Sequence, residues 1–117
     1  METKDYQCSI EVTIDAIGGK WKCIILYYLS KNGAMRFGEI LRTAKGASTK
    51  MIAQQLRQLE AHGLLEKEIF PEIPPRVEYK LTPYGNSVVP LLYMMSEWGG
   101  KHWCFLDHTD IEAEVLR

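Results

Sequence analysis

The chain has 117 residues, enough for one domain with a single hydrophobic core but not for two. With 46% hydrophobic and 25% charged residues it has the composition of a globular protein, which excludes a disordered or low-complexity chain. The net charge is only -1, but residues 20–57 hold eight Lys or Arg against one acid, Glu39, so this stretch sums to +7 and the remainder to -8. Positive charge gathered in one stretch predicts a surface that attracts polyanions.

The cysteines and the lack of long apolar runs indicate the compartment. Cys8, Cys23 and Cys104 are odd in number and have no paired spacing, which argues against a disulfide framework and indicates a reducing environment. The sequence shows no secretion signal, and no apolar run is long enough to cross a bilayer. We therefore expect a cytoplasmic protein with no membrane partner.

Two amphipathic helices are predicted before residue 34. The first starts after Ser9, its expected N-cap, and ends at the glycines 18 and 19. Its apolar face consists of Ile10, Ile14 and Ile17. The second ends at Gly33 and buries a wide stripe of residues spaced by three and four, namely Trp21, Ile24, Ile25, Tyr28 and Leu29. Residues 34–35 are predicted to form a very short edge strand.

A helix-turn-helix is predicted for residues 37–63. Residues 37–44 form a helix whose buried side carries Phe37, Ile40, Leu41 and Ala44. Residues 45–47, with a glycine in the middle, are the only connection to the next helix. Two amphipathic helices joined by so short a turn lie at a steep angle, which is the helix-turn-helix arrangement.

The second helix of this pair, residues 48–63, has both ends marked by its sequence. Ser48 is a hydroxyl N-cap, and Gly63 is the usual residue just past a helix end. The inward stripe consists of Ile52, Leu56 and Leu59. The outward face, about half a turn away, is basic and amide-rich and consists of Lys50, Gln54 and Arg57.

This outward face has the side chains that read bases in a major groove, where Arg pairs with guanine and Gln with adenine through two hydrogen bonds. An exposed helix face is polar by default, so on this helix alone a solvated face is an equally good interpretation. The basic segment around the helix favours contact with DNA.

After Gly63 the apolar period changes from helical to alternating, which predicts a β-hairpin. The alternation assigns one face to Leu65, Lys67 and Ile69 in the first strand and to Val77, Tyr79 and Leu81 in the second. Pointing outward are Arg76, Glu78 and Lys80. Residues 71–75, PEIPP, cannot continue a ladder and form a stiff tip, so the hairpin is a β-wing. Contact of Arg76 with a DNA groove and a solvated edge arginine are equal alternatives.

The C-terminal part is predicted to form a long helix that starts at residues 82–83, where a hydroxyl N-cap is followed by proline. It carries too many apolar residues for one face, so we expect it to pack against its own domain and a second chain. Pro90 predicts a kink just before it, and the glycines 99 and 100 are expected to end the helix. A capping box at 109–112 predicts a last short helix.

Several segments together resemble the HxlR-type winged helix-turn-helix regulators, a family close to the MarR-type regulators. The resemblance rests on Cys8, IGGKW at 17–21, RFGEI at 36–40, STKMIAQQLRQLE from residue 48, PEIPPRVEYKLT at 71–82, Gly85 and EWG at 97–99. IGGKW together with the proline-rich wing is a highly specific combination. The resemblance implies a mainly α fold with a small β-hairpin wing. It also implies a single domain over residues 1–117, family-like at about 8–100, with a C-terminal dimerisation extension at 101–117.

The resemblance further implies a homodimeric regulator of transcription, repressor or activator, that binds a pseudo-palindromic operator in double-stranded DNA without a cofactor. The expected DNA contacts are Arg36, Ser48, Thr49, Lys50, Gln54, Arg57 and Arg76. The first and last helices form the dimer interface in this family, and the expected interface residues are Ile10, Ile14, Leu91, Leu92, Met95 and Trp98.

Cys8 occupies a position at which several members of this family have a cysteine that senses oxidants or electrophiles. It directly precedes Ser9, and the positive end of a helix dipole there favours a thiolate. A small apolar side chain in the dimer interface is an equal alternative. Cys23 is expected in the core, so Cys104 is the expected partner for a bond between chains. A small-molecule effector is also compatible with the resemblance.

Two other classes of function, an enzyme and a protein-binding module, are alternatives to a regulator that binds DNA. His102, Cys104 and His108 lie close in sequence, but their spacing matches no standard zinc pattern, and no phosphate loop or nucleophile motif is present. We therefore expect neither an enzyme nor a metal site. The alternative is a winged helix that binds only protein, for which the outward face at 50–57 would be apolar or acidic rather than basic. DNA binding that weakens steeply with salt separates these two functions.

Overall fold

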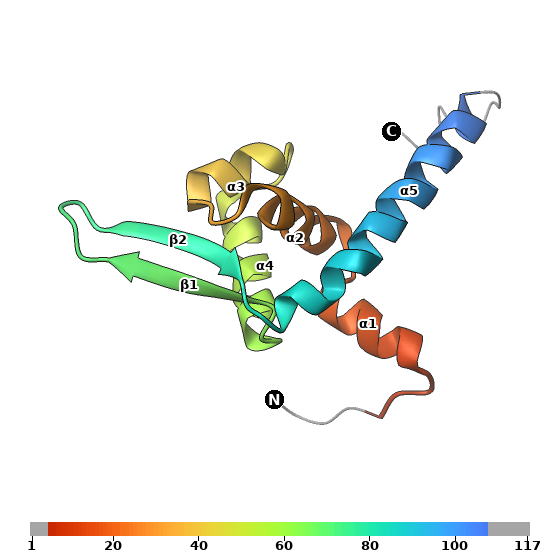
Figure 1. The fold of residues 1–117 in the computed structure, drawn as a ribbon, viewed down its shortest axis with the longest axis horizontal. Coiled ribbons are helices and arrows are strands. Elements are labelled where there is room, and N and C mark those ends of the chain that lie inside the picture. The colour runs from red at the N-terminus through yellow and green to blue at the C-terminus, as the bar shows by residue number, and fades with distance from the viewer. Residues whose placement is uncertain (1–4, 108–117) are drawn as a thin grey trace.

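The computed structural model describes residues 5–107 and has the predicted mainly α architecture with one β-hairpin (Figure 1). In chain order the elements are α1 (Ser9–Ile17), α2 (Lys20–Asn32), α3 (Phe37–Thr43), α4 (Thr49–Ala61), β1 (Leu65–Phe70), β2 (Arg76–Leu81), the 3-10 turn η1 (Gly85–Val88) and α5 (Val89–Leu106). The hairpin and α5 leave the helical body on opposite sides (Figure 1). This is the winged helix-turn-helix fold. No helix within residues 5–107 is both long and apolar enough to span a bilayer.

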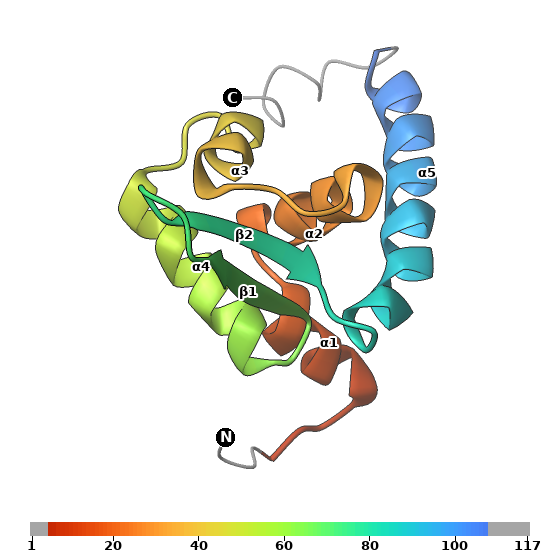
Figure 2. The same ribbon diagram turned by 60° about the vertical axis from the view of Figure 1, so that its left-hand side comes forward.

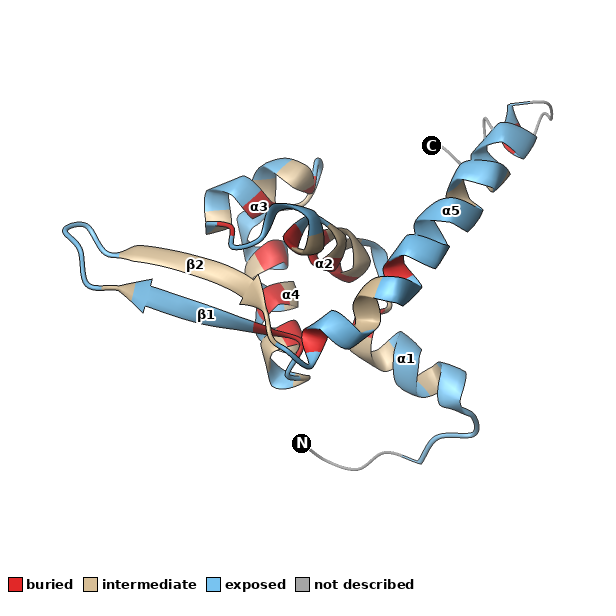
Figure 3. Ribbon diagram, viewed as in Figure 1, coloured by how far each residue is buried: buried red, intermediate tan, exposed pale blue. Residues whose placement is uncertain are grey.

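The core lies where α2, α3 and α4 meet the base of the hairpin (Figure 3). The predicted inward stripe of α4, made of Ile52, Leu56 and Leu59, is fully buried there. It packs with Ile25 and Leu26 of α2, which are equally buried. The burial of this apolar surface is what fixes α4 on α2 and leaves the opposite side of α4 in solvent.

The hairpin pairs Leu65 opposite Leu81 through to Phe70 opposite Arg76, and this register brings the two predicted strand faces side by side. In place of the strand expected at residues 34–35 the chain forms one isolated bridge, in which Met35 and Tyr79 exchange backbone hydrogen bonds of 2.9 and 2.8 Å. Only the inner end of the apolar hairpin face reaches the core. Leu65 is buried, whereas Ile69 is 62% exposed because the outer half of the wing extends beyond the helices.

A close contact between η1 and Leu64, in the turn between α4 and β1, fixes where α5 begins. Gly85 is buried, and a methyl group on it would lie 1.9 Å from the carbonyl oxygen of Leu64. The Thr82 hydroxyl accepts a hydrogen bond of 2.8 Å from the Gly85 N–H and donates one to the Gly63 carbonyl. The helix expected from Thr82 therefore starts with a turn and η1 instead.

The C-terminal helix differs from the prediction in two further ways. Pro90 does not kink a continuous helix, because it lies in the first turn of α5, where its missing N–H has no intrahelical partner to lose. Gly99 and Gly100 do not end α5, which continues to Leu106. A glycine in a helix weakens it without forbidding it. The capping box expected at 109–112 lies outside the described residues.

Leu92 and Ser9 do not have the positions that the sequence predicts for them. Leu92 was expected in the dimer interface, but it is only 3% exposed and belongs to the core of its own chain. Ser9 was expected as the N-cap of the first helix, but α1 begins at Ser9 and Cys8 is the N-cap. The Glu11 carboxylate accepts a 3.2 Å hydrogen bond from the Gln7 N–H, so the start of this helix does not depend on a hydroxyl cap.

Candidate nucleic-acid interface

The turn between α3 and α4 is held by local hydrogen bonds. The Ala47 N–H donates to the Ala44 carbonyl at 3.0 Å, and Gly46 has a φ of 95°, which favours glycine. The Ser48 hydroxyl then accepts a hydrogen bond of 3.1 Å from the Met51 N–H, as expected of an N-cap. These contacts fix the direction in which α4 leaves the turn.

The exposed face of α4 carries the side chains predicted to contact DNA. All of Ser48, Thr49, Lys50, Gln54 and Arg57 are exposed, and they lie along one helix. Within residues 5–107, no hydrogen bond or ion pair to protein holds the side chains of Lys50, Gln54 or Arg57. They are therefore available to a ligand, while the opposite side of the same helix is locked in the core.

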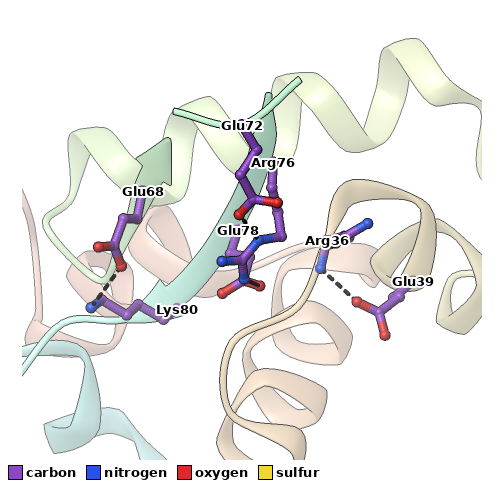
Figure 4. Close-up of polar contacts among 7 residues, drawn as sticks. All are labelled: Arg36, Glu39, Glu68, Glu72, Arg76, Glu78 and Lys80. Atoms are coloured by element: carbon purple, nitrogen blue, oxygen red, sulfur yellow. Dashed lines mark hydrogen bonds and ion pairs between the residues drawn. The ribbon is translucent and has the colours of Figure 1, made fainter. Parts of the chain in front are cut away.

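Arg36 is the N-cap of α3, and its exposed side chain adds a further positive charge to the basic segment 20–57. Its backbone N–H donates a 2.8 Å hydrogen bond to the Glu39 carboxylate (Figure 4). The one acid of the basic segment is thus engaged at the N-terminus of a helix, where a negative charge is favourable. The Arg36 side chain stays exposed.

Arg76 is separate from the α4 face, because it lies at the outer end of β2 in the wing. Its Nε is 2.8 Å from the Glu72 carboxylate and its Nη1 is 2.6 Å from that of Glu78 (Figure 4). The guanidinium also lies over the Phe70 ring, with Cζ 3.8 Å from the ring centroid. Hydrogen bonds to Glu72 and Glu78 raise the pKa of Arg76.

The wing as a whole is more acidic than the α4 face. Lys80 lies 3.7 Å from Glu66 and 3.4 Å from Glu68, so its charge is also balanced by neighbouring carboxylates. The sequence predicts that Arg76 and Lys80 point outward, but this prediction did not include their ion pairs with the acids of the wing. The hairpin register could have revealed them, because it places Lys80 directly opposite Glu66.

The three cysteines occupy different environments. Cys8 is exposed at the N-cap of α1, with its Sγ 3.9 Å from a carboxylate oxygen of Glu11. Cys23 is partly buried, donates to the Ile17 carbonyl at 3.1 Å, and has its pKa raised by burial. Cys104 is exposed on α5. The first turn of α1 and the last turn of α5 lie far apart in both views of the chain (Figures 1 and 2).

Several proteins that are similar to this chain in sequence and fold are named as regulators. The family described as HxlR-like helix-turn-helix matches residues 16–106. A relative from Methanothermobacter thermautotrophicus, named as an HTH-type transcriptional regulator, is 48% identical over 105 residues, covering 87% of this chain and 79% of its own.

Two solved regulators share the fold. The redox regulator HypR in its reduced form has a TM-score of 0.81 at 38% identity, covering 87% of this chain and 100% of its own. Diamide-treated YodB from Bacillus subtilis has a TM-score of 0.67 at 31% identity, covering 83% and 96%. The family model matches residues 16–106, and the relative from Methanothermobacter thermautotrophicus is 48% identical. The chain therefore belongs to the HxlR-like helix-turn-helix family.

Proposed function

We propose that two copies of this chain bind one pseudo-palindromic operator, with the α4 helices in successive major grooves about 34 Å apart. Family membership makes the chain a transcriptional regulator of the helix-turn-helix type. The observation that carries the proposal is the α4 helix, which is buried along Ile52, Leu56 and Leu59 and presents unengaged basic and amide side chains on its other side.

The residues of α4 divide into two roles by their position. Thr49 and Lys50 lie in the first turn, beside the N-terminus that favours anions, and they contact phosphates. Gln54 and Arg57 lie one and two turns further along, and they read base edges. Phosphate contacts fix the register on DNA, and base contacts supply the sequence preference.

Replacing Gln54 or Arg57 by Ala is expected to relax discrimination at one base pair by about 1–3 kcal/mol. Lys50→Ala is expected to weaken binding to all sequences alike, with a shallower salt dependence. The measurement is fluorescence anisotropy on a duplex selected from a random library and on unrelated duplex. Lys101→Ala, which removes an exposed cation from α5, is the control. Equal losses on both duplexes for all α4 variants would contradict base reading by α4, and binding insensitive to salt would favour a protein partner.

Support for pairing of two copies comes from the apolar side chains left in solvent on α1 and α5. Ile10 and Ile14 are 69% and 59% exposed, and Trp98 is 66% exposed. Along α5, Trp98, His102 and Phe105 stack with ring centroids 4.9 and 5.7 Å apart. Met95 and Leu91 extend this face toward the start of the helix. An apolar surface of this kind is typical of an interface.

We also propose that Arg76 contacts the minor groove beside each half-site, and this contact has an energetic cost. To reach a minor groove, the guanidinium must exchange the Glu72 and Glu78 carboxylates for phosphate or base oxygens. The two carboxylates would remain close to the DNA. We therefore expect the wing to contribute less to affinity than the α4 face does.

A redox response through Cys8 is the second part of the proposal. It is favoured by the exposure of this thiol at the N-cap of α1 and by similarity to HypR, a redox regulator, and to YodB, solved after diamide treatment. Because the first turn of α1 and the last turn of α5 are far apart in one chain, a bond between Cys8 and Cys104 would join two chains. Two thiols lose two electrons and two protons to diamide, which becomes the hydrazine.

Treatment with diamide is expected to change DNA affinity in the parent protein and to leave a Cys8→Ser variant unaffected. Non-reducing gel electrophoresis should show a covalent dimer in the parent and none in Cys8→Ser or Cys104→Ser. The control is Cys23→Ser, which removes a partly buried thiol and should leave the dimer band in place. A Cys8→Ser variant that responds to diamide as the parent does would disprove the sensor role of Cys8.

A further inference from the structure

Met51 is an apolar side chain left in solvent on the helix that we propose enters the major groove. Its side chain is 40% exposed, whereas Ile52 beside it is fully buried. Between residues 37 and 61, all of which the structure describes, Met51 is the one exposed large apolar residue. The helix-turn-helix therefore has a single exposed apolar side chain of this size.

Pairing of two copies does not account for the exposure of Met51. The other large apolar side chains that are exposed within residues 5–107 lie outside α3 and α4, and most of them are on α1 and α5. The proposed contact between copies would cover that apolar face of α1 and α5. Met51 lies on a different helix, among the side chains proposed to contact DNA.

The backbone of Met51 is fixed in the first turn of α4. Its N–H donates a 3.1 Å hydrogen bond to the Ser48 hydroxyl, and the Ser48 carbonyl accepts one of 3.1 Å from the Ile52 N–H. Met51 precedes Gln54 by three residues, so their side chains are neighbours on the helix surface. The N-terminal part of a recognition helix is the part that contacts base edges. Met51 therefore lies beside the residue proposed to read adenine.

The major-groove edge of an A·T pair has a polar and an apolar part. Adenine presents N7 and the N6 amino group, with which an amide side chain can pair, and thymine presents O4 and its C5 methyl group. A methyl group forms no strong hydrogen bond, so a protein recognises it by apolar contact. Lys50, Gln54 and Arg57 end in polar groups, whereas the flexible thioether of Met51 can adapt to a methyl group.

We infer that Met51 contacts the C5 methyl group of one thymine in each half-site, in the base pair read by Gln54 or in the pair next to it. The inference rests on the proposed function, because it requires α4 in the major groove. The contact removes the methyl group and the end of the Met51 side chain from water. It adds a preference for thymine to the polar base contacts of Gln54 and Arg57.

Replacement of thymine by deoxyuridine tests this contact, because it removes the methyl group and keeps the base pairing and the polar groups. The probe is a duplex that the parent chain selects from a random library, with each thymine of a half-site changed in turn, and fluorescence anisotropy measures the affinity. At one position we expect deoxyuridine to weaken binding about fourfold, as loss of one buried methyl group would. The same change in both half-sites should weaken binding about fifteenfold.

Variants of Met51 connect the effect to this side chain. Met51→Ala should bind the thymine duplex more weakly than the parent does and should lose the sensitivity to deoxyuridine at that position. Met51→Leu keeps an apolar side chain of similar size and should retain the sensitivity. The matched control is Lys50→Ala in the same turn, which should weaken binding to both duplexes and leave their ratio unchanged. Thermal unfolding midpoints should stay near that of the parent, because both residues are exposed.

An equal effect of deoxyuridine in Met51→Ala and in the parent would overturn the inference, because another side chain would then contact the methyl group. So would a selected half-site in which no thymine responds to loss of its methyl group. In both cases a relaxed base preference in Gln54→Ala would still support the proposed function. If the parent chain selected no duplex at all, the proposed function and the role of Met51 would both be wrong.

Discussion

Gly85→Ala is expected to lower the free energy of unfolding by more than about 3 kcal/mol. The added methyl group would lie 1.9 Å from the Leu64 carbonyl oxygen and 2.9 Å from the Leu64 carbonyl carbon, and backbone atoms cannot rotate away as a side chain does. Moving η1 to relieve this clash would break the hydrogen bonds through which Thr82 joins Gly85 to Gly63. Urea unfolding followed by circular dichroism measures the change.

The matched control for this substitution is Gly38→Ala in α3. The nearest atom to a methyl group there is the Arg42 guanidinium at 3.9 Å, so no contact opposes it. Alanine in place of a helical glycine should raise stability by up to about 1 kcal/mol. If the two alanine variants had similar stabilities, the contact of Gly85 with Leu64 could not be what fixes the start of α5.

Trp98→Lys is expected to separate the two copies and to lower affinity for a two-half-site duplex by about 100-fold or more. The exposed Trp98 ring is the largest member of the stack with His102 and Phe105, and a lysine there puts a hydrated charge into the face proposed to pair. Affinity for a single half-site should change little. Sedimentation velocity reports the oligomeric state, and anisotropy on one-site and two-site duplexes reports the affinities.

Glu97→Lys is the control for the second prediction, because it introduces the same lysine at the neighbouring position of α5. Glu97 is exposed and its carboxylate lies 3.4 Å from Lys101, so this position is on the charged side of the helix. We expect it to leave association nearly intact. A dimeric Trp98→Lys variant with unchanged DNA affinity would mean that the apolar face of α5 covers something other than a second copy.

The helix-turn-helix was predictable because its signals are local. Ser48 caps α4 through its own hydroxyl, Gly63 follows the helix with a φ of 74°, and the buried stripe of Ile52, Leu56 and Leu59 repeats at helical spacing. Each of these properties depends on a few neighbouring residues. The same was true of the hairpin, whose faces follow from simple alternation.

The features that sequence reasoning missed all depend on contacts between distant residues. Gly85 meets Leu64 across twenty-one positions, which moves the start of α5, and Leu92 turns into the core although its neighbours Leu91 and Tyr93 are exposed. Arg76 is engaged by carboxylates of the wing rather than left free. An open cavity of about 320 Å³ between α2 and α5, lined by Tyr27, Tyr28 and Met95 among others, was equally hidden. Tyrosine and methionine look the same in sequence whether they fill a core or line a space.

The paired glycines inside α5 give its two halves unequal local stability. Gly99 and Gly100 together make the helix about 2 kcal/mol less favourable than two alanines would, and a methyl group on either would meet nothing within 4 Å. The turns between these glycines and the buried Leu106 should therefore open more readily than the first turns of α5, where Leu92 is fixed in the core. Association through Trp98 and Phe105 would then include ordering of a partly frayed segment. The entropic cost of this ordering would make the proposed pairing weaker and more sensitive to temperature than the exposed apolar area alone suggests.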